Sequence, residues 1–194
     1  MKRAPRVAAV QDISGFGRCS MTVALPVLSA MGAQCCPLPT AYLSAHTAFP
    51  ELGKAAFLDL TRELEQTQEH WAALGVALDA VYSGFIGSAG QIAAIRRFYE
   101  RFRGADTVVL CDPVMGDGGR PYRTYTPDMC RAMGELAALA DVITPNLTEA
   151  ALLLGEEYAD APGSETAARA WLERLSRDGR RSVVLTGLSF TGGE

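Results

Sequence analysis

The sequence predicts an α/β fold in which a mostly parallel central sheet is flanked by helices. Short runs of β-forming residues alternate along the chain with longer segments whose apolar residues recur at helical spacing. The β-forming runs lack regular polar alternation, which is typical of parallel strands buried on both faces. No repeat, low-complexity tract or linker interrupts the pattern, so we expect the 194 residues to form one domain.

The expected strands and helices follow one another in this order. The β-forming runs are Val7–Val10, Cys35–Leu38, Ala80–Ser83, Thr107–Cys111, Val142–Thr144 and Ser182–Thr186. Helical spacing is found over Ser20–Met31, from Phe57 to Leu74, from Ile92 to Phe102 and from Ala168 to Leu175.

Several residues mark how the helices begin, end or pack. Ser164 is expected to cap a helix N-terminus, and Gly32 and Gly179 are expected to end helices. The helix over Ser20–Met31 is apolar nearly all round, so we expect it to be buried and kinked at Pro26.

Composition and charge exclude several classes of protein. The chain is 48% hydrophobic and 21% charged, which is typical of a globular protein. Its net charge is −4 and it has no stripe of basic residues, so we do not expect it to bind nucleic acid. No stretch reaches membrane-spanning length, and the apolar run near the start is too short for a signal peptide. The 5 cysteines show no C-x-x-C spacing and are expected to be buried thiols in a reducing cytoplasm. Because the sequence has only 2 histidines, we do not expect a multi-histidine metal site.

In a parallel sheet, ligands bind beyond the carboxyl ends of the strands. The segments that follow the expected strands are rich in glycines, hydroxyls and carboxylates: QDISGFGRCS, PTAYLSAHTAF, SGFIGS, DPVMGDGG, TPNLTEA and TGLSFTGGE. In DPVMGDGG, Asp112 and Asp117 could be ordinary turn residues, or two carboxylates that hold phosphates or a hydrated metal.

TPNLTEA also allows two interpretations. Asn146 and Glu149 have the spacing of a helix capping box, which taken alone is the better interpretation. Their expected place on the same sheet edge as Asp112 and Asp117 favours a surrounding for Mg²⁺.

The first two loops suggest a pocket for a small molecule. Gly15 to Ser20 resembles a dinucleotide-binding glycine loop, but its third position is Ser20 and no acidic residue ends the second strand. A tight turn is the better interpretation, with Asp12 and Ser14 facing a ligand. His46 and Thr47 could line a pocket for a flat polar molecule, and Phe85 is either a stacking face or a core residue.

Taken together, the segments VQD, GFGRCS, LSAHT, SGFIGS, CDPVMGD, ITPNLTEA and VVLTG closely resemble the pyridoxal/pyridoxamine kinases of the ribokinase-like superfamily. The resemblance covers essentially the whole chain. It implies a three-layer ribokinase-like fold and phosphorylation of the 5′-hydroxymethyl group of a B6 vitamer by ATP. It also implies Mg²⁺, a monovalent cation as a further candidate, and a cytoplasmic homodimer.

The resemblance implies a role for each candidate residue. On the vitamer side, Asp12 stands where the family places a serine, Ser14 lies beside it, His46 and Thr47 belong to the covering loop, and Phe85 flanks the ring. On the nucleotide side it implies Asp112, Tyr125, Thr144, Thr186 and Gly187, and near the metal Asp117, Asn146 and Glu149.

The family's catalytic base, the Asp of a G-x-G-D motif, is absent from the sequence. We therefore expect a kinase chain that lacks the C-terminal part of the fold, including the phosphate-binding helix N-terminus, and that is inactive as it stands. Two alternatives remain open: a hydroxymethylpyrimidine kinase of thiamine synthesis, and a vitamer-binding or partner-binding protein without catalysis.

Overall fold

The computed structural model describes residues 3–46, 49 and 54–189. The chain divides into two compact units, Met1–Val109 (unit 1) and Leu110–Glu194 (unit 2). The expectation that both belong to one domain stays a prediction.

Unit 1 is built on four neighbouring strands in the order β3-β2-β1-β4. β1 (Arg6–Ser14) pairs in parallel with β2 (Gln34–Leu43) and with β4 (Ala80–Ser83), whereas β3 (Phe57–Asp59) pairs antiparallel with β2. Successive residues of a strand point to opposite faces, and Ala8, Ala9 and Val10 are all fully buried. Both faces of β1 are therefore covered.

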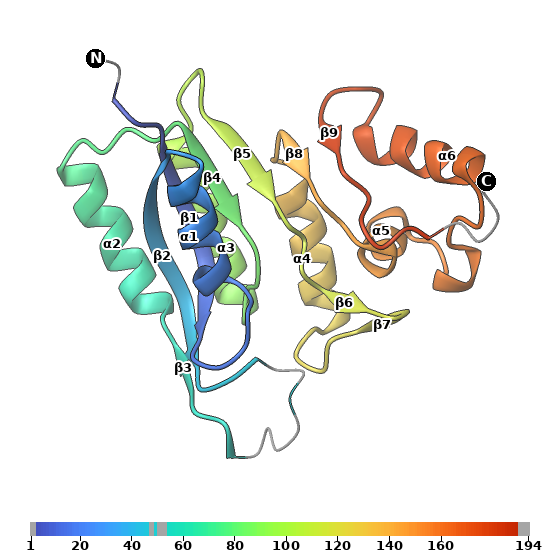
Figure 1. The fold of residues 1–194 in the computed structure, drawn as a ribbon, viewed down its shortest axis with the longest axis horizontal. Helices are drawn as coiled ribbons and strands as arrows, with labels where there is room; N and C mark the ends of the chain where they lie inside the picture. Colours follow the sequence, from blue (N-terminus) through green and yellow to red (C-terminus); the bar gives the residue numbers. More distant parts are fainter. Residues whose placement is uncertain (1–2, 47–48, 50–53, 190–194) are drawn as a thin grey trace. The chain divides into compact units, whose positions relative to one another are not determined.

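The helices of unit 1 cover these faces. α1 (Met21–Ala30) lies in front of β1 and β2 in Figure 1, and α3 (Ala89–Phe102) lies behind β4. α2 (Thr61–Ala73) packs beside α3 through the rings of Trp71, Phe98 and Phe102, whose centroids lie 4.5–6.4 Å apart. Such tilted and edge-on ring pairs stabilise a helix pair beyond the apolar area they bury.

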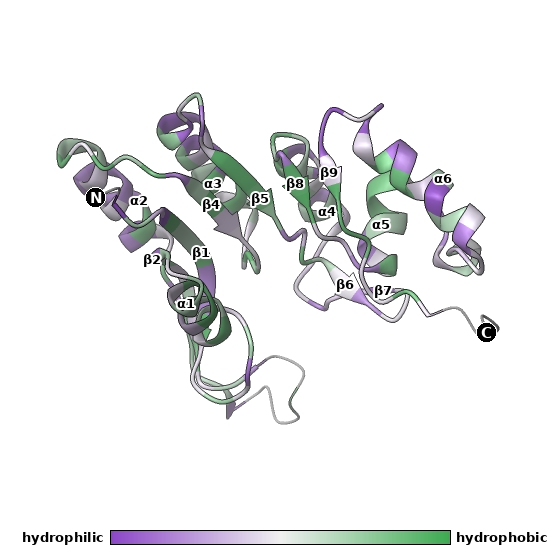
Figure 2. Ribbon diagram, turned by 45° about the horizontal axis from the view of Figure 1, so that its top comes forward, coloured by the Kyte–Doolittle hydropathy of each residue, from purple (hydrophilic) through white to green (hydrophobic). Residues whose placement is uncertain are grey.

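The described part of unit 2 contains the end of β5, two further parallel strands, a hairpin and three α-helices. β8 (Val142–Ile143) pairs with β5 (Val108–Cys111) and with β9 (Ser182–Val183). The hairpin consists of β6 (Gly116–Asp117) and β7 (Arg120–Pro121). The helices are α4 (Pro127–Ala137), α5 (Leu147–Leu154) and α6 (Glu165–Ser176), with a short 3-10 turn, η2, at Tyr158–Asp160. Figure 2 shows that β5 and β8 are mostly hydrophobic, whereas α6 carries both hydrophilic and hydrophobic residues.

The α/β class with a mostly parallel sheet flanked by helices is confirmed, and so are most of the expected elements. β4 has the predicted bounds, while β1 and β2 extend further toward the site than predicted. Ser164 caps α6 by accepting from Ala167 N at 3.3 Å, and Gly32 follows α1 with φ 84°. α6 ends at Ser176, three residues earlier than Gly179 suggested, because Arg177 and Asp178 already adopt positive φ.

The prediction of helical structure from Phe57 was wrong. Phe57–Asp59 forms an edge strand, β3, whose residues pair with Leu43, Tyr42 and Ala41 of β2. The helix begins only at Thr61, whose N–H donates to Asp59 Oδ1 over 2.8 Å. The spacing between Phe57 and the apolar residues of α2 matches a helical repeat by coincidence, and the Phe57 side chain is 55% exposed.

The prediction that α1 is buried was also wrong. Only Met21 and Ala24 are buried, while Val23, Leu25 and Val27 are 39%, 40% and 51% exposed. One face of the helix packs on β1 and β2, and its other apolar face is not covered by the described residues. Pro26 lies inside the helix, which continues to Ala30.

Two further expectations concern cysteines and membranes. Cys111 is buried, but the other four cysteines are only half-buried, so the prediction of buried thiols holds for Cys111 alone. Within the described ranges, no helix is both long enough and apolar enough to cross a bilayer.

Candidate functional site

The candidate site in unit 2 starts where two paired strands end. Cys111 of β5 is in register with Ile143 of β8, so the residues that follow them, Asp112 and Thr144, are neighbours. Thr144 Oγ1 donates to Asp112 Oδ1 over 3.1 Å. Burial raises the pKa of Asp112, and the hydrogen bond from Thr144 opposes this rise. The two residues therefore form one polar pair at the carboxyl edge of the strands.

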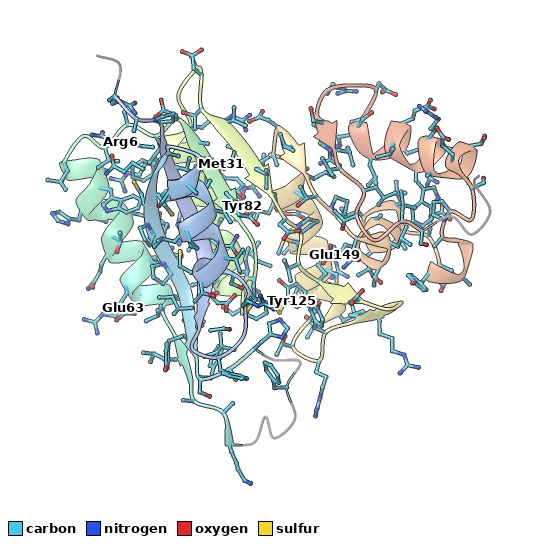
Figure 3. All side chains as sticks on the ribbon, viewed as in Figure 1. Arg6, Met31, Glu63, Tyr82, Tyr125 and Glu149 are labelled. Carbon is cyan, nitrogen blue, oxygen red and sulfur yellow. The ribbon has the colours of Figure 1, made fainter. Side chains whose placement is uncertain are left out.

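Asn146 and Glu149 form the predicted capping box at the start of α5. Asn146 Oδ1 accepts from Glu149 N over 2.9 Å, and Glu149 Oε2 accepts from Asn146 N over 2.8 Å. Glu149 is only 3% exposed, and its other oxygen accepts from Met115 N over 3.1 Å. In the view of Figure 3, Glu149 lies above the β6–β7 hairpin. The capping interpretation is confirmed, and the metal interpretation stays a prediction.

The electrostatic surroundings of Glu149 are unusual for a carboxyl group. Burial and, to a smaller extent, the negative charge of Asp112 raise its pKa to about 8. The backbone N–H groups of Asn146, Met115 and Gly116 lower the pKa, but they do not offset burial. Glu149 is therefore protonated in much of the population near neutral pH unless a cation lies close to it.

Asp117 lies in the β6–β7 hairpin beside the start of α5. Its side chain is exposed, and Oδ1 accepts from Gly118 N over 2.8 Å. The hairpin is attached to α5 by Asn146 Nδ2, which donates to Gly116 O over 2.8 Å. The structure thus brings Asp112, Asp117, Asn146 and Glu149 to one edge of unit 2.

Tyr122 belongs to this group of residues, and the sequence interpretation missed it. Burial raises its pKa, and the charges of Glu149, Asp117 and Asp112 raise it further. Its backbone N–H donates to Met115 O over 2.9 Å, directly after β7. The predicted tyrosine, Tyr125, is instead buried with 6% exposure. The signal that could have indicated Tyr122 is its place three residues after the glycine turn.

Thr186 and Gly187 lie near the same helix start. Thr186 forms an isolated parallel bridge with Asn146, and its N–H donates to Pro145 O over 2.9 Å. Gly187 follows with φ 73°, a conformation that favours glycine. Within residues 3–46, 49 and 54–189, no three His, Cys, Asp or Glu side chains are grouped closely enough to hold a bare metal ion. The arrangement suits a hydrated cation better than a closed metal cage.

The candidate site in unit 1 starts at the end of β1. Asp12 is 4% exposed and Ser14 is 1% exposed, and Ser14 Oγ donates to Asp12 Oδ2 over 2.8 Å. The register between β1 and β2 shifts by one residue between Gln11 and Ile13, with the additional residue in β2, so Asp12 lies opposite a bulge-like irregularity of that strand. Bulges often redirect side chains near binding sites. Phe85, after β4, is half-buried, and its carbonyl accepts from Thr40 Oγ1 over 3.1 Å.

The loop with His46 packs against the first glycine loop. His46 N donates to Phe16 O over 3.0 Å, and the rings of Phe16 and Phe49 lie 5.3 Å apart. A Cβ on Gly17 would lie 3.2 Å from His46 Cβ, so the two loops touch closely. Thr47, the other predicted residue of this loop, lies outside the described residues.

A match to a known protein family identifies the family to which the chain belongs. Residues 25–194, which include most of both candidate sites, match the phosphomethylpyrimidine kinase family. The chain belongs to the phosphomethylpyrimidine kinase family.

Individual members of this family resemble the chain over almost its whole length. Pyridoxal kinase PdxY of Deinococcus radiodurans is 32% identical over 192 residues, which are 94% of this chain and 62% of that protein. A crystal structure described as a putative phosphomethylpyrimidine kinase from Bacteroides thetaiotaomicron is 42% identical, with a TM-score of 0.89 over 97% of this chain and 64% of that one. The same protein was also crystallised with pyridoxal.

Pyridoxal kinase of Lactobacillus plantarum is 33% identical with a TM-score of 0.85, over 95% of this chain and 64% of that one. These family members confirm both the expected fold and the resemblance to pyridoxal kinases. The chain spans slightly less than two thirds of the length of the relatives compared: 62% for the Deinococcus protein and 64% for the two crystal structures.

Proposed function

We propose that the chain is a B6-vitamer kinase that transfers the terminal phosphoryl group of ATP to the 5′-hydroxymethyl group of pyridoxal, pyridoxine or pyridoxamine. One observation carries the proposal: a relative 42% identical to the chain over 96% of its length was crystallised with pyridoxal. The family description names phosphomethylpyrimidine instead, so hydroxymethylpyrimidine is the substrate against which the proposal is tested.

In this proposal, unit 2 binds the phosphates and Mg²⁺. Burial raises the pKa of Asp112, Glu149 and Tyr122, and nearby negative charges raise the pKa of Glu149 and Tyr122 further. A hydrated Mg²⁺ fits such a donor set, since oxygen ligands and retained waters are what this ion prefers. Exposed Asp117 would face the ion, with Asn146 and Glu149 behind it. Bound Mg²⁺ neutralises charge on the transferring phosphoryl group.

Residues beside the proposed Mg²⁺ site are further candidates for binding the nucleotide. Thr144, Thr186 and Gly187 are proposed to approach the phosphates, because hydroxyls and glycine backbone can donate to phosphate oxygens. Tyr122 is proposed as a candidate tyrosine beside Tyr125, since the three carboxylates contribute to the raised pKa of Tyr122.

In the same proposal, unit 1 binds the vitamer. Asp12 and Ser14 would accept and donate hydrogen bonds to the polar substituents of the ring. His46 and Thr47 would cover the ring, and Phe85 would lie against its face. Asp12 is a buried carboxylate with a hydrogen bond from Ser14, so a donor on the ligand would further stabilise its charge.

The sequence contains no G-x-G-D segment, which bears on turnover. We propose that the 194 residues by themselves bind ligands but transfer the phosphoryl group slowly. General-base assistance is worth roughly 10²–10⁴-fold in rate. Loss of donors to the developing charge costs on the order of 10²–10³-fold.

We also propose that the protein is a cytoplasmic homodimer, with α1 as a candidate contact surface. α1 contains no charged residue, and Val23, Leu25 and Val27 are 39–51% exposed. Met31, just beyond the helix, is 78% exposed and is marked in Figure 3. An uncharged apolar surface of this kind is typical of a surface that pairs with another protein surface.

Binding of the ring is the test that does not depend on turnover. Pyridoxine is the suitable titrant, since it lacks the aldehyde that would react with Lys54 and other amines. Calorimetric titration should give tighter binding of pyridoxine than of hydroxymethylpyrimidine. His46→Ala should weaken pyridoxine binding, whereas His70→Ala, on the exposed side of α2, should not. Tighter binding of hydroxymethylpyrimidine would assign the chain to the thiamine-pathway activity, and binding of neither ring would refute both.

A further inference from the structure

The β6–β7 hairpin that carries Asp117 is too small to be stable by itself. Each of its strands has two residues, and Gly118 and Gly119 form the turn with φ of 57° and 80°. Both positive φ values fit a two-residue hairpin turn, in which glycine is favoured at both central positions. Two-stranded hairpins are marginally stable at best in water. The position of Asp117 must therefore be fixed by contacts from outside the hairpin.

The first turn of α5 supplies these contacts at three points. Glu149 Oε1 accepts from Met115 N over 3.1 Å, and Asn146 Nδ2 donates to Gly116 O over 2.8 Å. Both bonds hold the chain where it enters the hairpin. The third bond reaches the turn itself, because Thr148 Oγ1 accepts from Gly119 N over 2.9 Å. Thr148 is 3% exposed, so water does not readily replace its hydroxyl in this bond.

Gly119 is held from a second side by an aromatic ring. A Cβ added to Gly119 would lie 2.6 Å from Cδ1 of Tyr158 in η2. Real Cβ atoms do not approach other atoms so closely, so the ring of Tyr158 packs directly on the glycine backbone. The turn is thus enclosed between the hydroxyl of Thr148 and the ring of Tyr158.

The Gly118–Gly119 turn also determines the direction of the Asp117 side chain, because Asp117 Oδ1 accepts from Gly118 N over 2.8 Å. We propose that Thr148 is a positioning residue that orients the Asp117 carboxylate by holding the Gly118–Gly119 turn through the Gly119 N–H. The importance of this orienting role for catalysis rests on the proposed function, in which Asp117 faces Mg²⁺. The orienting role itself depends only on the contacts within unit 2.

Thr148→Val removes the hydroxyl and keeps the shape of the side chain, and Thr148→Ser restores the hydroxyl. In the valine variant, the Gly119 amide should exchange its hydrogen about fivefold to tenfold faster, the factor expected for one net hydrogen bond. The NMR shift of the Gly118 amide proton, which reports its bond to Asp117, should also change. Thr148→Ser should return both readouts toward wild type. Thr67→Val, at another helix threonine that bonds to backbone, should change neither.

The link to the metal is tested by binding of Mn²⁺ with ADP, followed by electron paramagnetic resonance. Affinity should fall severalfold in Thr148→Val and recover in Thr148→Ser. Unchanged exchange at Gly119, or faster exchange with an unchanged Gly118 shift, would overturn the orienting role. If wild type does not bind Mn²⁺ with ADP, the proposed function fails at this edge, while the two amide readouts still decide the role of Thr148. If Thr148→Val does not fold, Tyr158→Ala tests the other side of the turn and should speed exchange at Gly119.

Discussion

Asn146 and Glu149 each satisfy the other's backbone N–H group, over 2.9 Å and 2.8 Å, while the Glu149 carboxyl group is almost completely buried. A buried acid that caps a helix and lies beside other acids is stable in its protonated form. This pair is therefore both a structural cap and a group whose charge responds to its surroundings.

The stability of the chain should depend on pH through Glu149. Its pKa is about 8 in the folded chain against an ordinary value of 4.5, so between these pH values the folded chain holds the extra proton. Stability should then be highest near the lower value and fall as pH rises through 8, by up to about 1.4 kcal/mol per pH unit. Chemical denaturation in the absence of Mg²⁺ across this range measures the effect.

Glu149→Gln should flatten this pH profile, because glutamine does not titrate. Its side chain has one oxygen for the three backbone N–H groups around this position, so the variant should also lose about 1 kcal/mol of stability at pH 5. Glu173→Gln, at an exposed position of α6, should leave the profile unchanged. An equally steep profile in Glu149→Gln would mean that other groups cause the pH dependence.

Asp117→Asn should weaken Mg²⁺-dependent nucleotide binding with little effect on folding. The side chain is exposed, and an asparagine oxygen can still accept from Gly118 N. Loss of one negative charge reduces attraction for the ion. Titration of MgADP measures this, with Asp178→Asn, a highly exposed residue of the α6–β9 loop, as the matched control. Equal affinity of wild type and Asp117→Asn for MgADP would show that Asp117 is not part of the proposed Mg²⁺ site.

Asp12→Ala should lower the affinity for pyridoxine by about tenfold, the order expected for one hydrogen bond to a charged group. Nucleotide binding should be unaffected, since the residues proposed to bind nucleotide all belong to unit 2. Asp12→Ser, which introduces the residue that the family resemblance implies here, should retain part of the affinity. Pyridoxine binding that does not change in Asp12→Ala would exclude this carboxylate from the vitamer site.

Val27→Glu in α1 should shift the chain from dimer to monomer, because a charge buried in an apolar contact surface is costly. Sedimentation velocity reports the change directly. Leu74→Glu is the control, because Leu74 is 64% exposed and lies outside α1. A dimer that survives Val27→Glu would place the contact surface elsewhere.

Some features of the fold and the site depend on residues close together in the chain, and local patterns predict these. Asn146 and Glu149 were predicted as a cap because capping depends on residues only three positions apart. Asp112 and Thr144 were expected at one edge because parallel strands align their carboxyl ends. Tyr122 and Thr148 were missed because their roles depend on contacts with distant residues, Glu149 and Gly119, that no local pattern indicates.

The errors have similar physical causes. Phe57 fits the helical spacing of α2, but edge pairing with β2 overrides that pattern. α1 is apolar nearly all round, which predicts burial in a monomer, yet seven of its ten residues are exposed. Composition cannot distinguish a helix buried in the core from one covered by a partner.

Phosphoryl transfer to the competing rings tests the central proposal most directly. The chain, and a chimera that continues after Glu194 with the remaining third of the Lactobacillus plantarum pyridoxal kinase, are each given MgATP with pyridoxal or with hydroxymethylpyrimidine. The 5′-phosphate product is followed by ³¹P NMR. We predict a higher kcat/KM for pyridoxal in the chimera and at least about 10²-fold slower turnover for the 194 residues alone. A higher kcat/KM for hydroxymethylpyrimidine would contradict the assignment as a B6-vitamer kinase.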